Sequence, residues 1–249
     1  MLSILKYSRY LIYISLLVAA SCSQSYKITQ HTPGSVKVKD VSPDSNLNNL
    51  IKPYKDQLDV KMSELIGRAD TTLTKKQPES TLGNFMADAQ LMVAREIDQT
   101  VSISVANYGG IRISYLTGGD IRLRNMYELM PFDNKLVIIE VSGTLLHQLC
   151  DHMAALGGWP VSGISVVIKD KKAINILVGD KQLNEQTTYK VAISDYVANG
   201  GDNCDFLKTA RQHATDILIR DALIGYVRSF TAQNKPLHSS LENRVQHAQ

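Results

Sequence analysis

The chain has little cysteine, little excess of charge of either sign and no apolar run long enough to cross a membrane. Three cysteines among 249 residues, with no C-x-x-C pair, exclude a disulfide scaffold and a zinc site built on paired thiolates. Lys and Arg number 27 against 24 Asp and Glu, so the strongly basic surface of a broad nucleic-acid binder is absent and we expect no nucleic-acid partner. The composition is otherwise that of an ordinary globular domain.

Catalytic motifs are also missing. The sequence has no G-x-S-x-G nucleophile turn and no G-x-x-x-x-G-K-[ST] phosphate loop, and its six histidines make no metal-ligand set with the carboxylates. The one cluster is His147, Cys150 and His152, whose side chains fan around a helix axis instead of sharing a face. His147 and Cys150 are three residues apart and could contact each other. The interpretation that we favour is that these residues belong to the surface and the core of a helix. We therefore expect no metal or other cofactor in this chain.

The first 21 residues have the pattern of a signal peptide. Lys6 and Arg9 precede an apolar run over residues 11–20, which is shorter than the roughly 20 residues that a membrane span needs. The small residues 19–21 lead into Cys22 and resemble the lipobox of bacterial lipoproteins, in which the cysteine is lipidated. The alternative is ordinary signal cleavage with an incidental Cys22. Both predict export, and the first predicts membrane attachment at the periplasmic face or cell surface.

Four later segments have the apolar spacing of helices, and they span 50–66, 82–97, 145–153 and 217–230. Pro53 fits the first turn of the earliest one, and Ser80 or Thr81 can cap the next. Alternating or apolar runs predict strands over 101–105, 136–141, 164–168, 173–178 and 189–193. Residues 170–172 are the expected hairpin tip.

Helices mixed with antiparallel-looking strands predict an α+β fold. We expect a single compact domain over 50–234, with a mixed, largely antiparallel sheet and flanking helices. Residues 22–49 are rich in Ser, Thr, Asn, Lys and Pro, and we interpret them as a tether running into an edge strand. Residues 235–249 are interpreted as a C-terminal tail.

The loop over 107–112 is suited to binding an anion. It follows a predicted strand, and Gly109 and Gly110 allow backbone amides to approach a ligand closely. Arg112 adds a planar fork that matches phosphate or carboxylate, and Asn107 begins the loop. A tight turn with a surface arginine is the alternative if this loop is considered alone.

Two further loops carry aromatic rings. Phe132 lies on a loop before a buried-looking strand, and Tyr196 precedes Gly200, Gly201 and Asp202. Two rings can hold a nucleobase between them. A carboxylate close by can accept both hydroxyls of a ribose. Together the loops predict a nucleoside or nucleotide ligand.

Four motifs in order, at 82–89, 107–112, 131–134 and 196–202, resemble the C-terminal domain of bacterial and animal 5′-nucleotidases and UDP-sugar hydrolases. The resemblance covers about 50–230. In that family this domain binds the nucleoside part of the substrate. A separate N-terminal calcineurin-like domain holds two metals and hydrolyses the phosphate ester.

The resemblance implies roles for the loop residues. Asn107 and Arg112 are expected near the phosphate. Phe132 and Tyr196 are expected to stack on the base, with Tyr196 in place of the more usual phenylalanine. Asp202 is expected to accept the ribose hydroxyls.

One cationic residue of the family pattern is missing. Relatives commonly carry an arginine just ahead of the Glu-x-x-Leu-Gly-Asn stretch, where this chain has Gln77 and Pro78. Lys75 or Lys76 could reach in from the same loop, although a lysine lacks the bidentate geometry of arginine.

The catalytic half of the family is missing as well. The Asp-x-His and Gly-Asn-His-Asp/Glu strings of the metallophosphatase domain do not occur, and about 50 residues ahead of Leu50 leave no room for it. We expect this chain alone not to hydrolyse phosphate esters. The leading hypothesis is the recognition half of a split 5′-nucleotidase whose partner metallophosphatase holds the divalent metals. The alternatives are a non-catalytic nucleotide- or nucleoside-binding lipoprotein and a relic used for protein contact.

Overall fold

Strand β6 (Lys135–Ser142) is buried on both faces, which explains its nearly continuous apolar sequence. Leu136 and Ile138 point into one hydrophobic cluster, and Val137 and Ile139 point into another. Successive side chains of a strand point to opposite faces, so a strand covered on both sides needs apolar residues at nearly every position.

The computed structural model describes residues 44–248, which form two larger sheets and two short ones. The five-stranded sheet has the order β12 (Arg211–Leu218), β6, β11 (Thr188–Ser194), β3 (Ile103–Val105) and β7 (Val161–Ser162). The four-stranded sheet has the order β10 (Lys181–Gln182), β9 (Lys172–Val178), β8 (Ile164–Lys169) and β13 (Val245–His247). The short sheets pair β1 (Leu65–Ala69) with β5 (Gly119–Arg122) and β2 (Leu73–Thr74) with β4 (Tyr115–Leu116).

Among these strands, only β11 with β3 and β13 with β8 pair in parallel. The sheets are therefore mixed and largely antiparallel. Together with the helices that cover them, they confirm the predicted α+β fold. The hairpin tip is confirmed too, because Asp170 and Lys171 adopt the left-handed φ values of 50° and 62° that such turns require.

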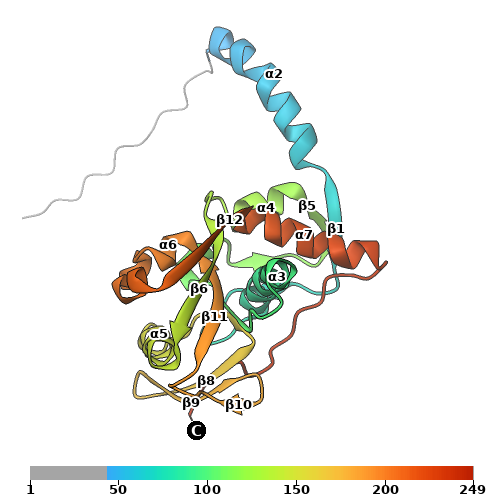
Figure 1. Cartoon of the computed structure of the whole chain (residues 1–249). Helices are drawn as coiled ribbons and strands as arrows, with labels where there is room; N and C mark the ends of the chain where they lie inside the picture. The colour runs from blue at the N-terminus through green and yellow to red at the C-terminus, as the bar shows by residue number, and fades with distance from the viewer. Residues whose placement is uncertain (1–43, 249) are drawn as a thin grey trace, which may run out of the picture. The chain divides into compact units, whose positions relative to one another are not determined.

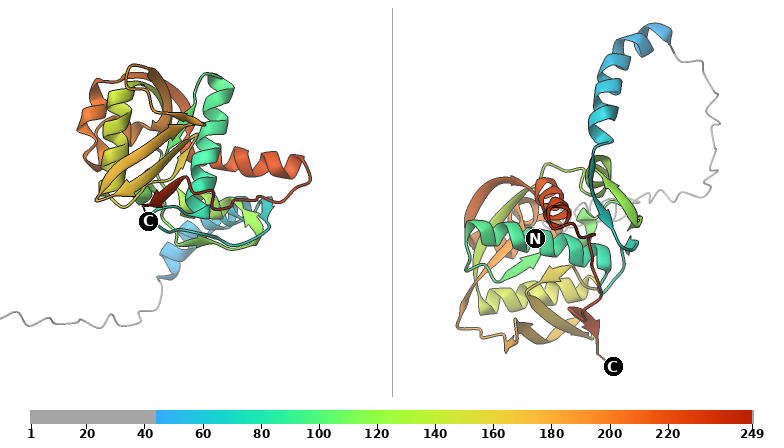
Figure 2. Two further views of the ribbon diagram at one scale, coloured as in Figure 1. Left: turned by 90° about the horizontal axis from the view of Figure 1, so that it is seen from below. Right: turned by 90° about the vertical axis from the view of Figure 1, so that its right-hand side faces the viewer.

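Helices cover both faces of the five-stranded sheet (Figures 1 and 2). On one face lie α3 (Thr81–Ile97), α4 (Leu123–Leu129) and α7 (Ile219–Ala232), which share a core with Leu136. On the other face lie α5 (Gly143–Ala155) and the short α6 (Asp195–Ala198). α5 contacts both β6 and β9, so it fills the space between the two larger sheets.

The expected helix boundaries hold in part. α3 begins where predicted, and the Ser80 side chain caps it by accepting from the amide of Gly83 at 3.1 Å. The last helix begins later than predicted, because Ile217 belongs to β12. The strand predicted from 101 begins at Ile103.

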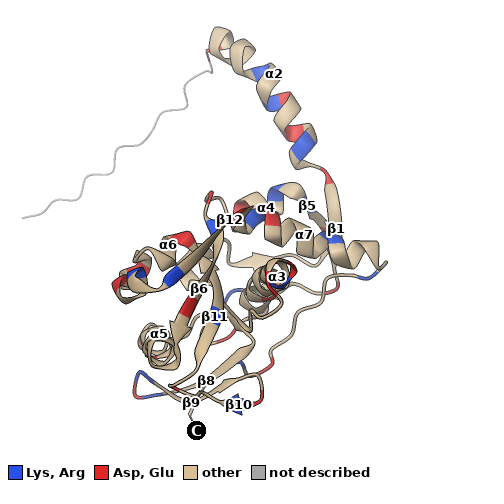
Figure 3. Cartoon of the chain, viewed as in Figure 1, with Lys and Arg blue, Asp and Glu red and all other residues tan. Residues whose placement is uncertain are grey.

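The earliest helix differs most from its prediction. α2 runs over Ser45–Met62, so residues 45–49 are helical instead of part of a tether, and Leu65 belongs to β1. Asp44 accounts for the early start, because its carboxylate accepts from the amides of the first turn. Pro53 therefore lies inside the helix. None of the side chains of α2 is buried, and the helix carries both acidic and basic residues along its length (Figure 3).

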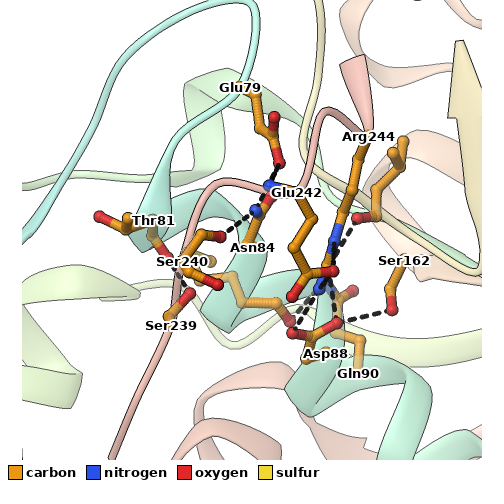
Figure 4. Close-up of polar contacts among 12 residues, drawn as sticks. Glu79, Thr81, Asn84, Asp88, Gln90, Ser162, Ser239, Ser240, Glu242 and Arg244 are labelled. Carbon is orange, nitrogen blue, oxygen red and sulfur yellow. Dashed lines mark hydrogen bonds and ion pairs between the residues drawn. The ribbon is translucent and has the colours of Figure 1, made fainter.

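The C-terminal segment is packed against the domain instead of forming a tail. β13 adds a parallel strand to β8, and Arg244 donates to both oxygens of Asp88 on α3 at 2.7 and 2.9 Å. Asn84, also on α3, donates to the carbonyl of Ser240 at 2.8 Å (Figure 4). Two polar residues of the 82–89 motif thus hold the end of the chain.

The predicted signal peptide and Cys22 lie outside the described residues. Within residues 44–248, no helix combines the length and the apolar character that a membrane crossing requires.

Candidate functional site

Three loops meet at one edge of the five-stranded sheet. The parallel strands β3 and β11 both end at this edge, and the antiparallel β6 begins there, with Leu136 opposite Ser194. The loops that follow β3 and β11, and the loop that precedes β6, are therefore neighbours although they are distant in sequence. An edge where adjacent parallel strands end is a common place for a ligand site in mixed sheets.

The loops surround a cavity of about 300 Å³. Its lining consists of Asn107, Gly109, Gly110, Arg112, Phe132, Asn134, Tyr196 and Asp202. The structure thus brings together seven of the nine residues that the sequence singled out. Gly200 and Gly201 are not part of the lining but form the turn that leads to Asp202. Asn134 also lines the cavity but was not among the predicted site residues, and only its place in the 131–134 motif pointed to it.

Asp202 is held by donors on both of its carboxylate oxygens. Asn107 donates to one oxygen at 2.7 Å, and the Tyr196 hydroxyl donates to the other at 3.0 Å. The amide of Asp202 lies 3.3 Å from the same hydroxyl and donates to it. These contacts join the loops after β3 and β11, so the carboxylate has a defined orientation at the cavity wall.

The turn before Asp202 depends on its glycines. Gly200 has a φ of 95°, and Asp202 itself has a φ of 52°. A Cβ on Gly201 would lie 2.5 Å from the Tyr196 ring, so only glycine lets the ring lie against the turn. The left-handed conformation of Asp202 is uncommon for a residue with a side chain, and its hydrogen bonds offset that cost.

His152 supports the same turn from outside the cavity. Its Nε2 lies 2.9 Å from the carbonyl oxygen of Asp202, which requires a proton on Nε2. The ring lies edge-on to Trp159 and to Phe206, with both centroid distances 5.7 Å. This contact could not be predicted from the sequence, because His152 and Asp202 are 50 residues apart. His147, in contrast, pairs with Glu185 at the surface.

The two rings of the cavity are not core residues. Phe132 is 40% exposed and Tyr196 is 47% exposed, whereas the core residue Phe85 is fully buried. The Arg112 guanidinium lies 5.4 Å from the centroid of the Phe132 ring. Both rings therefore have free surface on which a flat apolar group can stack.

Arg220 anchors the loop that carries Phe132. It lies on α7, is 6% exposed, and donates to the carbonyls of Met130 and Phe132 at 3.2 and 3.3 Å and to the carboxylate of Asp133 at 2.7 Å. Its guanidinium also lies 4.2 Å from the centroid of the Tyr127 ring. Arg220 was not predicted as a site residue, because an arginine in an otherwise amphipathic helix gives no sign of what it contacts.

Of the two candidate lysines, Lys75 reaches the loop after β3. Its Nζ donates to the carbonyl of Ile111 at 2.8 Å and lies 4.1 Å from the centroid of the Tyr108 ring. Burial, and secondly the nearby charge of Arg112, lower the pKa of Lys75. Gln77 turns the other way and donates to the carbonyls of Leu156 and Gly158 at the end of α5.

Over residues 44–248, no group of three or more His, Cys, Asp or Glu side chains could hold a metal ion. Cys150 and Cys204 are free and buried. Burial raises the pKa of each thiol to about 12, so both stay protonated near neutral pH.

The sequence of this chain is similar to those of known proteins. Residues 60–209 match the family model described as 5′-nucleotidase, C-terminal domain. A 5′-nucleotidase of Vibrio cholerae is 24% identical and matches 75% of this chain but 34% of its own length. A trifunctional nucleotide phosphoesterase of Bacillus subtilis is 29% identical and matches 78% of this chain but 14% of its own length. The chain thus spans about a third or less of these curated relatives.

A solved structure has the same fold. The 5′-nucleotidase precursor of Thermus thermophilus superposes with a TM-score of 0.71 at 23% identity, over 83% of this chain and 44% of that one.

Proposed function

We propose, since the chain belongs to the 5′-nucleotidase C-terminal domain family, that its cavity binds the nucleoside part of a nucleotide. The observation that carries this proposal is the meeting of two half-exposed rings, Phe132 and Tyr196, and one oriented carboxylate, Asp202, around a single cavity. The volume of about 300 Å³ lies at the lower end of the range for small-molecule sites. The rings bind the base, and Asp202 accepts from the sugar hydroxyls.

The charge of the lining favours a ligand with little charge of its own. Arg112 is the one cation of the lining and Asp202 the one carboxylate. Arg112 and the backbone amide of Gly109 form the side that suits a phosphate, since the amide of Gly110 already donates to the carbonyl of Asn107. A nucleoside or a nucleoside monophosphate fits this balance better than a polyphosphate.

We further propose that hydrolysis of the phosphate ester belongs to a separately encoded metallophosphatase that holds the divalent metals. The support is twofold. The sequence lacks the Asp-x-His and Gly-Asn-His-Asp/Glu strings of that domain, and this chain matches only 34% and 14% of the lengths of the two curated relatives. The two chains together would act in nucleotide catabolism.

The proposed location is outside the cytoplasm, with the lipid on Cys22 as the membrane anchor. The signal-like pattern of residues 1–21 and the small residues before Cys22 support this proposal.

A second candidate function is capture of a nucleotide or nucleoside without catalysis. The observation that favours it is that this cavity already combines two exposed rings with an oriented carboxylate, which can bind a nucleoside without a metal. Such a lipoprotein would bind its ligand with no partner present.

Calorimetric titration of the protein without its signal peptide tests the shared part of both proposals. We expect adenosine and AMP to bind, and adenine or ribose 5-phosphate to bind more weakly. Failure of the whole nucleoside and nucleotide panel would overturn the assignment of the cavity. Addition of a metallophosphatase encoded beside this gene, with AMP turnover as the readout, then separates the split enzyme from the binding protein.

A further inference from the structure

The Tyr196 hydroxyl makes two contacts with a single residue. It donates to Oδ1 of Asp202 at 3.0 Å and accepts from the amide of Asp202 at 3.3 Å. The ring and the carboxylate are therefore joined as one unit, and the packing of the ring against Gly201 restricts it further. A phenylalanine could stack on a base equally well but could make neither contact.

Asp202 keeps acceptor capacity after these contacts. An ionised carboxylate has about four lone-pair positions, two on each oxygen. Asn107 occupies one position on Oδ2, and Tyr196 occupies one on Oδ1. One position remains on each oxygen, so the carboxylate can still accept two hydroxyl donors at once.

The backbone of Asp202 is fixed as well as its side chain. His152 contacts the carbonyl oxygen at 2.9 Å, and the left-handed φ of 52° leaves the residue little freedom to rotate while these contacts persist. The carboxylate thus has its position set before a ligand arrives. Pre-organisation of this kind strengthens binding because less freedom is lost when the ligand binds.

We infer that the Tyr196 hydroxyl is a specificity determinant that holds Asp202 ready for a vicinal diol, so that the cavity selects ribonucleosides over deoxyribonucleosides. The inference rests on the proposed function of the cavity. It assigns to Tyr196 a second task, separate from stacking on the base. The competing hypothesis predicts the opposite effect, in which the Tyr196 hydroxyl occupies Oδ1, excludes a sugar hydroxyl and weakens ribose binding.

Tyr196→Phe separates the two tasks, because it keeps the ring and removes only the hydroxyl. Calorimetry should compare adenosine, 2′-deoxyadenosine, 3′-deoxyadenosine and adenine on the wild-type and variant proteins. We expect the variant to bind adenosine about 5- to 10-fold more weakly, which corresponds to one hydrogen bond of typical net strength. The two deoxynucleosides should change by less than about twofold, since each offers only one of the two hydroxyls, and adenine should not change.

Tyr189→Phe is the matched control. The Tyr189 hydroxyl also accepts from a backbone amide, that of Asn184 at 3.0 Å, but Tyr189 is not part of the cavity lining. This variant should leave all four affinities unchanged. Melting curves of both variants report whether the fold is preserved.

The outcomes are distinguishable. Selective loss of adenosine affinity in Tyr196→Phe supports the inference. The inference is overturned if Tyr196→Phe weakens binding of all four ligands equally, weakens none of them, or binds adenosine more tightly. In each of these cases, nucleoside binding by the wild-type protein leaves the proposed function intact. Wild-type protein that binds none of the four ligands overturns the proposed function and this inference with it.

Discussion

Arg220 donates to the backbone carbonyl of Phe132 at 3.3 Å, so a buried guanidinium on α7 determines where the exposed ring stands. The two residues are 88 positions apart. The family match ends at residue 209, yet the loop that carries Phe132 depends on a helix beyond that limit. The cavity therefore needs α7 as well as the three loops that line it.

Arg220→Lys tests this dependence. Lysine keeps the charge but cannot donate to two carbonyls and a carboxylate in the planar geometry of arginine. We expect adenosine affinity to fall about tenfold and the free energy of unfolding to fall by about 1–3 kcal/mol, because buried acceptors lose their donors. Binding of ribose 5-phosphate, which does not use Phe132, should change little.

Arg228→Lys, on the same helix, is the control for Arg220→Lys. Arg228 pairs with Glu64 at the surface and should tolerate the change without loss of binding or stability. Reduced stability of Arg220→Lys with full adenosine affinity would show that Arg220 supports the fold but not the site.

The rings themselves give the second prediction. Stacking is commonly worth about 1–3 kcal/mol per ring, so Phe132→Ala or Tyr196→Ala should weaken adenosine binding by roughly 5- to 150-fold. The melting temperature should change little, since both rings are at least 40% exposed. Tyr115→Ala is the control, because Tyr115 is 59% exposed and lies outside the cavity. A large fall in stability with unaltered affinity would contradict the stacking assignment.

The strands and loops of this domain could be predicted from the sequence wherever a local pattern of residues determines the conformation of the segment. The apolar run of β6 shows burial on both faces, and the left-handed turn at Asp170 and Lys171 follows from a short polar segment between two strands. The cavity residues Gly109, Gly110 and Phe132 could be predicted because glycines and aromatic rings next to strand ends are typical of binding loops.

The remaining parts depend on contacts between distant segments, which spacing does not encode. The sequence around His152 does not indicate that this residue contacts Asp202. The sequence around Arg244 likewise does not indicate its ion pair with Asp88. The apolar stripe of α2 likewise predicted a helix correctly but not its start at Ser45 or the exposure of its side chains, since periodicity does not say what covers a face.

Thiol chemistry gives the third prediction. Burial raises the pKa of Cys150 and Cys204 to about 12, and the thiolate is the reactive form, so neither thiol should react with a disulfide reagent between pH 7 and 9 while the protein is folded. Two thiols should react once urea unfolds a Cys22→Ser protein. Rapid reaction of either thiol in the folded protein would contradict the burial of these side chains.

The fourth prediction concerns export. Replacement of Cys22 by Ser removes the thiol that lipid attachment requires, so the variant should leave the membrane fraction for the soluble fraction. Immunoblots of fractionated cells measure the distribution. Cys150→Ser is the control and should stay with the membranes. A Cys22→Ser protein that resists high-salt washing of the membranes would rule out the lipid anchor.

The last prediction separates the C-terminal segment from ligand binding. Asp88→Ala removes both acceptors of the Arg244 fork and leaves a side chain that is 13% exposed without its main partner. Loss of one partner from a buried pair costs about 3–5 kcal/mol, and we expect about 3 because Glu242 still contacts Arg244. For a domain of this size that corresponds to a melting temperature about 6–12 °C lower.

Adenosine affinity should be unchanged in Asp88→Ala below its melting range, since Asp88 does not line the cavity. Asp56→Ala breaks the exposed pair with Lys52 on α2 and should leave the melting temperature unaltered. If Asp88→Ala instead keeps the wild-type melting temperature, the Arg244 pair does not hold the C-terminal segment. If it loses adenosine affinity at full stability, the 82–89 motif acts on the site and not only on the end of the chain.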